Sequence, residues 1–342
     1  MYFKIKILII SILFFVFTSC INEINFDAQQ LSNNLVLNCL VSPDSLVKVN
    51  FTNSRFFLEP DADFVTVKDL EVNLYINAIF KETLKLKGSN YVSTYRTKVG
   101  ERVKITARRP STETNISAQT LVPSTASLTS IDSSRVATFN TYLTHDTIDN
   151  LQIKRIDTLG YARNFKFAFA VKLLDDAETR NYYRLAATIR QTYSDGKSSS
   201  KKLVLYPDDA VFERVDGADI FDANSNRNFN IFTDSTFDGQ YYTLKTSAKL
   251  AHLLPTPLKI KYPPASITKI PVKTELIFDL QSIDNNFYNY LKTVKYNNTD
   301  LQYFSEPVQV YNNVTNGIGL LGGVSHRYYT FQLAAATSGY YY

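Results

Sequence analysis

The sequence predicts a mostly β protein in two parts, an N-terminal immunoglobulin-like β-sandwich followed by a larger antiparallel β domain with one packed helix. Apolar residues recur at every second position in many short segments, which is typical of half-buried strands. Only one segment shows a helical period. The 342 residues, 44% hydrophobic and 20% charged, exclude a disordered chain and are enough for two domains.

Residues 1–19 have the features of a secretory signal peptide. Lys4 and Lys6 precede an apolar run over 7–17 that is interrupted only by Ser11. The run is too short to cross a bilayer as a helix, which takes about twenty residues. It fits the apolar region of a signal that is removed after export.

The next residues resemble the cleavage box of a bacterial lipoprotein. They read Phe-Thr-Ser-Cys over 17–20, with Phe17 where an aliphatic side chain is usual. The resemblance implies cleavage between Ser19 and Cys20 and attachment of diacylglycerol to the Cys20 thiol. Each buried acyl CH₂ contributes about 0.8 kcal/mol, so three chains such as palmitate would hold the protein firmly to a membrane. An ordinary signal peptide with an incidental cysteine is the alternative.

A polar tether is expected over residues 20–33, because this stretch shows no sustained period. The acidic residues Glu23 and Asp27 follow Cys20 closely, as in some surface-exposed lipoproteins. The second cysteine, Cys39, lies in an apolar segment and is interpreted as a small core residue, with a reactive thiol as the alternative.

The first domain is expected over residues 34–123. Its strands show an apolar face that alternates with a polar face, and turn-like residues separate them. Several short strands at this spacing favour an immunoglobulin-like sandwich. The alternating apolar positions are Val47, Val49, Phe51, Val72, Leu74, Ile76, Val103, Ile105 and Ala107.

The second domain is expected over residues 124–342, again from alternating strands. One helix is predicted over about 283–296, with Ser282 as its cap and Asp284 in its first turn. Its apolar face is expected to pack on the second sheet. The apolar strand positions are Phe165, Phe167, Phe169, Val171, Leu173, Tyr183, Leu185, Ala187, Ile189, Val272, Thr274, Leu276, Phe278 and Leu280, and those of the helix are Ile283, Phe287, Leu291 and Val294.

A polar stretch over 207–230 is expected to form a long loop on the second domain. Asp216, Asp219 and Asp222 offer oxygen ligands at short spacing, which suits calcium. Their order does not match an EF-hand, so they are weak calcium candidates and no metal site is predicted.

Glycines are concentrated near the C-terminus. Asn316, Gly317, Gly319, Gly322 and Gly323 lie within eight residues, where they permit positive φ and close backbone approach. Tight packing against the N-terminal domain is one interpretation, and a loop that contacts a ligand or partner is the other. The segment lacks the Lys-Ser or Lys-Thr of a phosphate-binding loop, which excludes that site.

Patterns typical of enzyme active sites are missing from the sequence. His145, His252 and His326 form no zinc motif, and no Gly-x-Ser-x-Gly elbow occurs. The acidic pairs at 175–176 and 208–209 are interpreted as solvated loop residues rather than as catalytic acids. We therefore predict no catalytic residue, no cofactor and no enzymatic activity.

Three segments together resemble a family of uncharacterised Bacteroidetes lipoproteins, domain of unknown function 4249. They are residues 306–323, residues 232–239 and residues 280–291. The resemblance implies a two-part β protein anchored in the outer membrane, which accompanies a TonB-dependent receptor. It supplies no catalytic residues.

The expected function follows from the anchor and the resemblance. We expect a lipid-anchored outer-membrane accessory protein, a non-catalytic binding or scaffolding partner of a TonB-dependent transporter. A cell-surface adhesin or structural lipoprotein is the alternative, followed by a hydrolase whose catalytic residues are distant in sequence. The net charge of +5 is too small to indicate nucleic-acid binding.

Overall fold

The computed structural model describes residues 34–54, 64–149, 152–177, 180–193, 195–213, 229–250, 259–260, 271–297 and 309–333, with the backbone alone for 138–164, 259–260, 271, 296–297 and 333. The predicted signal peptide, the cleavage residues Ser19 and Cys20, and the tether lie outside these ranges. So do the calcium candidates Asp216, Asp219 and Asp222.

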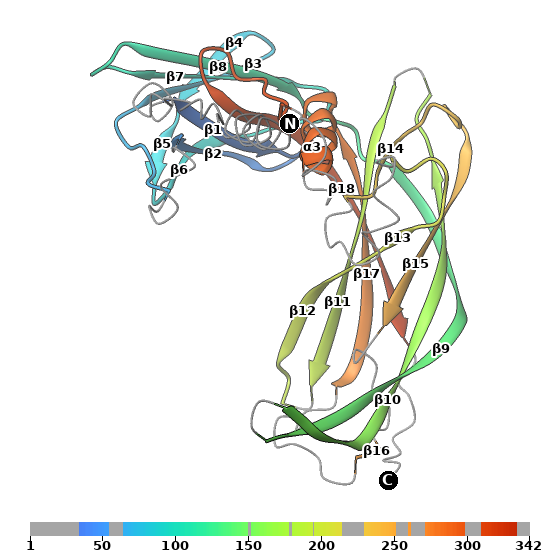
Figure 1. The fold of residues 1–342 in the computed structure, drawn as a ribbon. Coiled ribbons are helices and arrows are strands. Elements are labelled where there is room, and N and C mark those ends of the chain that lie inside the picture. Colours follow the sequence, from blue (N-terminus) through green and yellow to red (C-terminus); the bar gives the residue numbers. More distant parts are fainter. Residues whose placement is uncertain are drawn as a thin grey trace, which may run out of the picture.

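The N-terminal part is a β-sandwich (Figure 1). One sheet has the order β4-β3-β7-β8, and the sheet facing it contains β1-β2-β6-β5. Alternating residues of both sheets fill one core, which includes the predicted positions Val49, Leu74 and Ile105. The strands are β1 (Leu35–Val41), β2 (Leu46–Asn53), β3 (Glu71–Ile76), β4 (Ile79–Thr83), β5 (Lys85–Lys87), β6 (Asn90–Arg96), β7 (Arg102–Arg109) and β8 (Thr114–Leu121).

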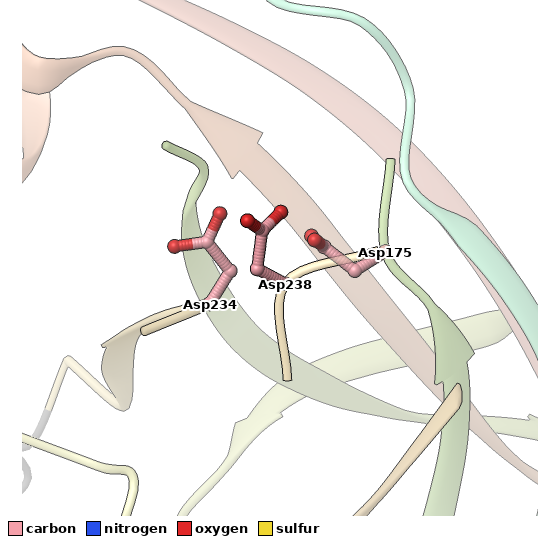
Figure 2. Close-up of side chains that lie close together, drawn as sticks. All are labelled: Asp175, Asp234 and Asp238. Carbon is pink, nitrogen blue, oxygen red and sulfur yellow. The ribbon is translucent and has the colours of Figure 1, made fainter. Parts of the chain in front are cut away.

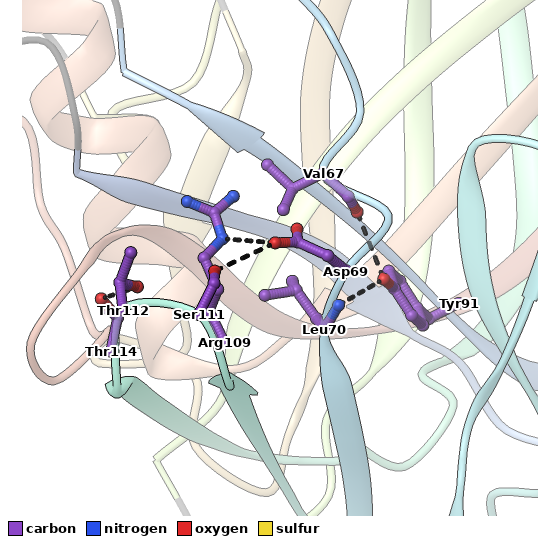
Figure 3. Close-up of polar contacts among 8 residues, drawn as sticks. All are labelled: Val67, Asp69, Leu70, Tyr91, Arg109, Ser111, Thr112 and Thr114. Carbon is purple, nitrogen blue, oxygen red and sulfur yellow. Dashed lines mark hydrogen bonds and ion pairs between the residues drawn. The ribbon is translucent and has the colours of Figure 1, made fainter.

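Tyr91 holds the segment that leads into β3 (Figure 3). Its side chain is buried, and its hydroxyl accepts a hydrogen bond from the Leu70 amide at 3.1 Å and donates one to the Val67 carbonyl at 3.3 Å. On the same segment, the Asp69 carboxylate lies 3.3 Å from the Arg109 guanidinium. The hydrogen bonds of Tyr91 and the ion pair of Asp69 therefore fix residues 67–70 against the sandwich.

The second part is longer and also has two facing sheets (Figure 1). One contains β12-β11-β17-β18 with β14 beside β11, and the other contains β13-β15-β10 with β9 and β16 beside β10. Phe169 and Phe278 meet between the sheets with ring centroids 5.0 Å apart. The strands are β9 (Ser127–Asp149), β10 (Gln152–Leu174), β11 (Tyr182–Tyr193), β12 (Ser198–Leu203), β13 (Tyr206–Pro207), β14 (Ile231–Thr233), β15 (Tyr241–Leu250), β16 (Lys259–Ile260), β17 (Pro271–Ile283) and β18 (Ile318–Leu333).

Strand β18 belongs to both parts. Its residues 318–323 pair in parallel with β1, from Val36↔Ile318 to Val41↔Gly323. Its remaining residues, from Val324 to Leu333, pair antiparallel with β17. One continuous sheet therefore runs through both parts, and the predicted domain boundaries at 123 and 124 stay a prediction.

Helix α3 (Asn285–Asn297) lies where the two parts meet (Figure 1). Its cap is Asp284, whose carboxylate accepts a hydrogen bond from the Phe287 amide at 3.0 Å. The prediction that Ser282 caps the helix is wrong, because β17 extends to Ile283 and the Ser282 hydroxyl instead accepts a hydrogen bond from the Ala126 amide. The predicted fold class, mostly β of sandwich type with one packed helix, is confirmed within the described residues.

Candidate functional site

One buried carboxylate connects the two parts of the molecule. The Asp284 carboxylate accepts hydrogen bonds from the Gly323 amide at 2.9 Å and from the Thr120 hydroxyl at 2.6 Å, besides the helix-capping bond from Phe287. Burial raises the pKa of Asp284, while the hydrogen bonds that it accepts act in the opposite direction. A single side chain thus links β8, α3 and β18.

Two of the C-terminal glycines are needed for close backbone approach. A Cβ atom on Gly319 would lie 2.0 Å from the Leu37 carbonyl oxygen, and one on Gly323 would lie 2.1 Å from the Leu121 carbonyl oxygen. Both distances are far below van der Waals contact, so neither position accommodates a side chain. Gly319 also has φ of +122°, which L-residues rarely adopt.

The other two glycines of the C-terminal cluster, Gly317 and Gly322, also pack closely against neighbouring segments. A Cβ on Gly317 would lie 2.9 Å from a methyl group of Ile116, and one on Gly322 would lie 2.9 Å from the Phe287 side chain. Asn316 has a left-handed backbone with φ of +57°. The structure thus places these residues in and just before β18, packed on the N-terminal sandwich and α3, as the first of the two interpretations expects.

A groove with a volume of about 510 Å³ lies at the same junction. Residues from both parts line it, which is a common setting for binding sites. Its wall includes the exposed apolar side chains of Val99 and Leu121. Arg102 comes from the N-terminal sandwich, while Arg180 and Tyr182 come from the second part.

Three aspartates form a second cluster (Figure 2). Asp175, Asp234 and Asp238 each bring one carboxylate oxygen within 4.8 Å of the others, and the first two side chains are buried. Asp175 accepts hydrogen bonds from the Tyr183 hydroxyl and the Gly239 amide. Such oxygen groups could hold a hard cation, but each buried carboxylate already has protein donors.

The surroundings of Asp234 raise the pKa of its carboxyl group. Burial raises its pKa, and the charges of Asp175 and Asp238 raise it further, against the lowering by the Asn181 amide. That amide donates to the Asp234 carboxylate at 2.6 Å. Asn181 directly precedes β11 and Asp234 directly follows β14, so this hydrogen bond fastens the turn between β14 and β15 to the start of β11.

The expectation that the acidic pairs are solvated is wrong for one member of each. Asp175 and Asp209 are buried, whereas their neighbours Asp176 and Asp208 are exposed. Asp209 accepts hydrogen bonds from the Tyr242 hydroxyl at 2.8 Å and the Lys245 amide at 3.1 Å. The tyrosine partners, Tyr183 for Asp175 and Tyr242 for Asp209, come from neighbouring strands of the fold, so the sequence alone did not indicate this role.

Of the three histidines, only His326 has a described side chain. Its Nδ1 lies 2.9 Å from the Asp279 carboxylate, and its ring stacks on Tyr328 with centroids 5.7 Å apart. His145 has only a described backbone, and His252 lies outside the described residues. Cys39 is free and buried, as predicted, and burial raises the pKa of its thiol to about 12.

Comparison with known proteins assigns the chain to a family. Searches of curated proteins and of solved structures give no match. The family model described as domain of unknown function matches residues 21–330, which is most of the chain. The protein therefore belongs to the family of domain of unknown function 4249.

Proposed function

We propose that the protein is a lipid-anchored outer-membrane accessory protein, which acts as a non-catalytic binding or scaffolding partner of a TonB-dependent transporter. The observation that carries the proposal is the position of Cys20. It follows a charged start, an apolar run over 7–17 and the two small residues Thr18 and Ser19, and the family match begins at the next residue, 21. This arrangement is typical of a cleaved lipoprotein signal.

The fold suits a body held at a short distance from a bilayer. The first strand begins at Leu35, so residues 20–33 lie between the acylated cysteine and the sandwich. Fully extended, such a tether reaches at most about 50 Å. In the described part of the chain, no helix combines the length and apolar character required to cross a bilayer.

The anchor is tested by Cys20→Ala. Cells that produce this variant should release the protein from the membrane fraction, and mass spectrometry should find no acyl groups on it. Cys39→Ala is the matched control, because Cys39 is the buried second cysteine and its removal leaves the lipid in place. Membrane attachment and acyl mass that persist in Cys20→Ala would refute the anchor.

The partner is tested by capture of the tagged wild-type lipoprotein from mild detergent extracts. We expect a large outer-membrane barrel with a TonB-box signature to co-purify. Deletion of the lipoprotein should then impair nutrient uptake. Loss of adhesion with normal uptake, and no barrel in the captured material, would favour the adhesin or structural lipoprotein instead.

A further inference from the structure

Arg184 on β11 is a partly buried arginine that forms no ion pair with an acidic residue in the described part of the chain. Its neighbours Tyr183 and Leu185 point into the core, so Arg184 lies on the opposite face of the sheet. Its Nε is buried and has no hydrogen-bond partner, and no described carboxylate forms an ion pair with it. Buried polar groups are normally satisfied, and an arginine usually pairs with an acid, so this exception needs an explanation.

The nearest acid is already engaged. Asp279 on β17 accepts a hydrogen bond from the Gln281 side-chain amide at 2.6 Å, and His326 Nδ1 lies 2.9 Å from the same carboxylate. Asp279 also lines the cavity that Arg184 faces, and its charge acts on Arg184 without a direct ion pair. Because Nε is unpaired, turning the guanidinium toward a ligand would break no hydrogen bond of that atom within the protein.

Arg184 lines a cavity of about 660 Å³ on this outer face. This volume lies within the range of small-molecule sites, which is roughly 300–1,000 Å³. The Phe229 ring lies beside the guanidinium, with its centroid 5.7 Å from the central carbon. Lys202 adds a second cation on the neighbouring strand β12, and Ala186 and Val204 supply apolar wall.

We propose that this cavity binds the oxyanion group of a small, partly apolar ligand, with Arg184 as its main contact. A guanidinium matches the two oxygens of a carboxylate or phosphate and donates in its own plane. Phe229 and the apolar wall suit the rest of such a ligand, and Lys202 adds attraction. The proposal goes beyond the accessory role and does not depend on the lipid anchor or on a barrel partner.

The experiment is a calorimetric titration of the full chain, purified in detergent, with benzoate and with phenyl phosphate. Benzamide is the neutral control ligand of nearly the same shape. We expect saturable binding of at least one anion, at least about tenfold tighter than benzamide. The two anion arms distinguish a carboxylate from a phosphate site. Cys20→Ala should bind as the wild type does, which separates this proposal from the anchor.

Arg184→Gln should weaken anion binding by about 10- to 100-fold, as expected for the loss of a charged hydrogen-bond donor. Arg108→Gln, at an exposed arginine on β7 that lines neither the cavity nor the groove at the junction, is the matched control and should bind like the wild type. If Arg184→Gln does not fold, Arg184→Lys keeps the charge but not the paired donors, and should weaken binding by about tenfold. Absence of binding to both anions, equal binding of benzamide, or unchanged affinity in the Arg184 variants would overturn the proposal.

Discussion

Gly323→Ala tests whether the junction between the two parts depends on backbone contact. The new Cβ would lie 2.1 Å from the Leu121 carbonyl oxygen and 2.9 Å from Pro123 Cδ. A carbon and an oxygen need about 3.3 Å, so the backbones must separate by roughly 1 Å. The movement would also strain the hydrogen bond between the Gly323 amide and the Asp284 carboxylate.

The expected cost has two parts. Overpacking a close-packed site costs about 1–3 kcal/mol, and weakening a hydrogen bond to a buried carboxylate adds about 1.5–3 kcal/mol. We therefore expect Gly323→Ala to lower the free energy of unfolding by at least about 2.5 kcal/mol. For a chain of this size, that corresponds to a melting temperature lower by at least about 4 °C.

The assay is thermal unfolding followed by circular dichroism, with urea unfolding as a second measure. Gly322→Ala is the matched control, because the nearest atoms to its Cβ would be side-chain atoms of Phe287 and Leu40 at 2.9 and 3.0 Å, a much milder overlap than that with a carbonyl oxygen at 2.1 Å. It should cost less than Gly323→Ala. If Gly323→Ala melts within about 2 °C of the wild type, the inferred backbone contact is not what holds the junction.

Three further predictions concern stability. Tyr91→Phe should cost about 1–3 kcal/mol in urea unfolding, because the Leu70 amide loses its acceptor; an unchanged midpoint would contradict this. Ala78→Gly should stabilise the protein by about 1 kcal/mol, because Ala78 has φ of +67°; a lower melting temperature would contradict it. Asp234→Asn should stabilise the protein at neutral pH. The pKa of Asp234 is raised in the folded state, so the carboxyl group costs stability as the pH rises from the pKa of the unfolded chain through the pKa of the folded protein. The gain should vanish below the unfolded pKa of about 3.9, and a gain that persists there would refute the electrostatic cause.

Local patterns predicted the strands well, because burial on one face of a sheet imposes a period of two residues. Leu276, Phe278 and Leu280 are fully buried in β17, as their alternation indicated. The helix was also found, but its cap was placed two residues early, since no local signal showed that β17 continues to Ile283.

The sites depend on contacts between distant segments, which a single sequence does not reveal. Asp175 and Asp234 meet only because β14 pairs with β11. Arg184 looked like any polar residue on the solvent side of a strand, and only the cavity and the unpaired Nε distinguish it. The glycine cluster indicated close approach, but its partners Leu37 and Leu121 could not be named from the pattern.

The parallel pairing of β1 with β18 has a consequence for biogenesis. Strand β1 has β2 beside it in the sequence, but its other neighbour consists of residues 318–323, which are synthesised long after it. Until then the amino-terminal sandwich keeps an open edge, which invites pairing with other chains. A polypeptide shortened before Ile318 should therefore aggregate rather than yield a smaller working module.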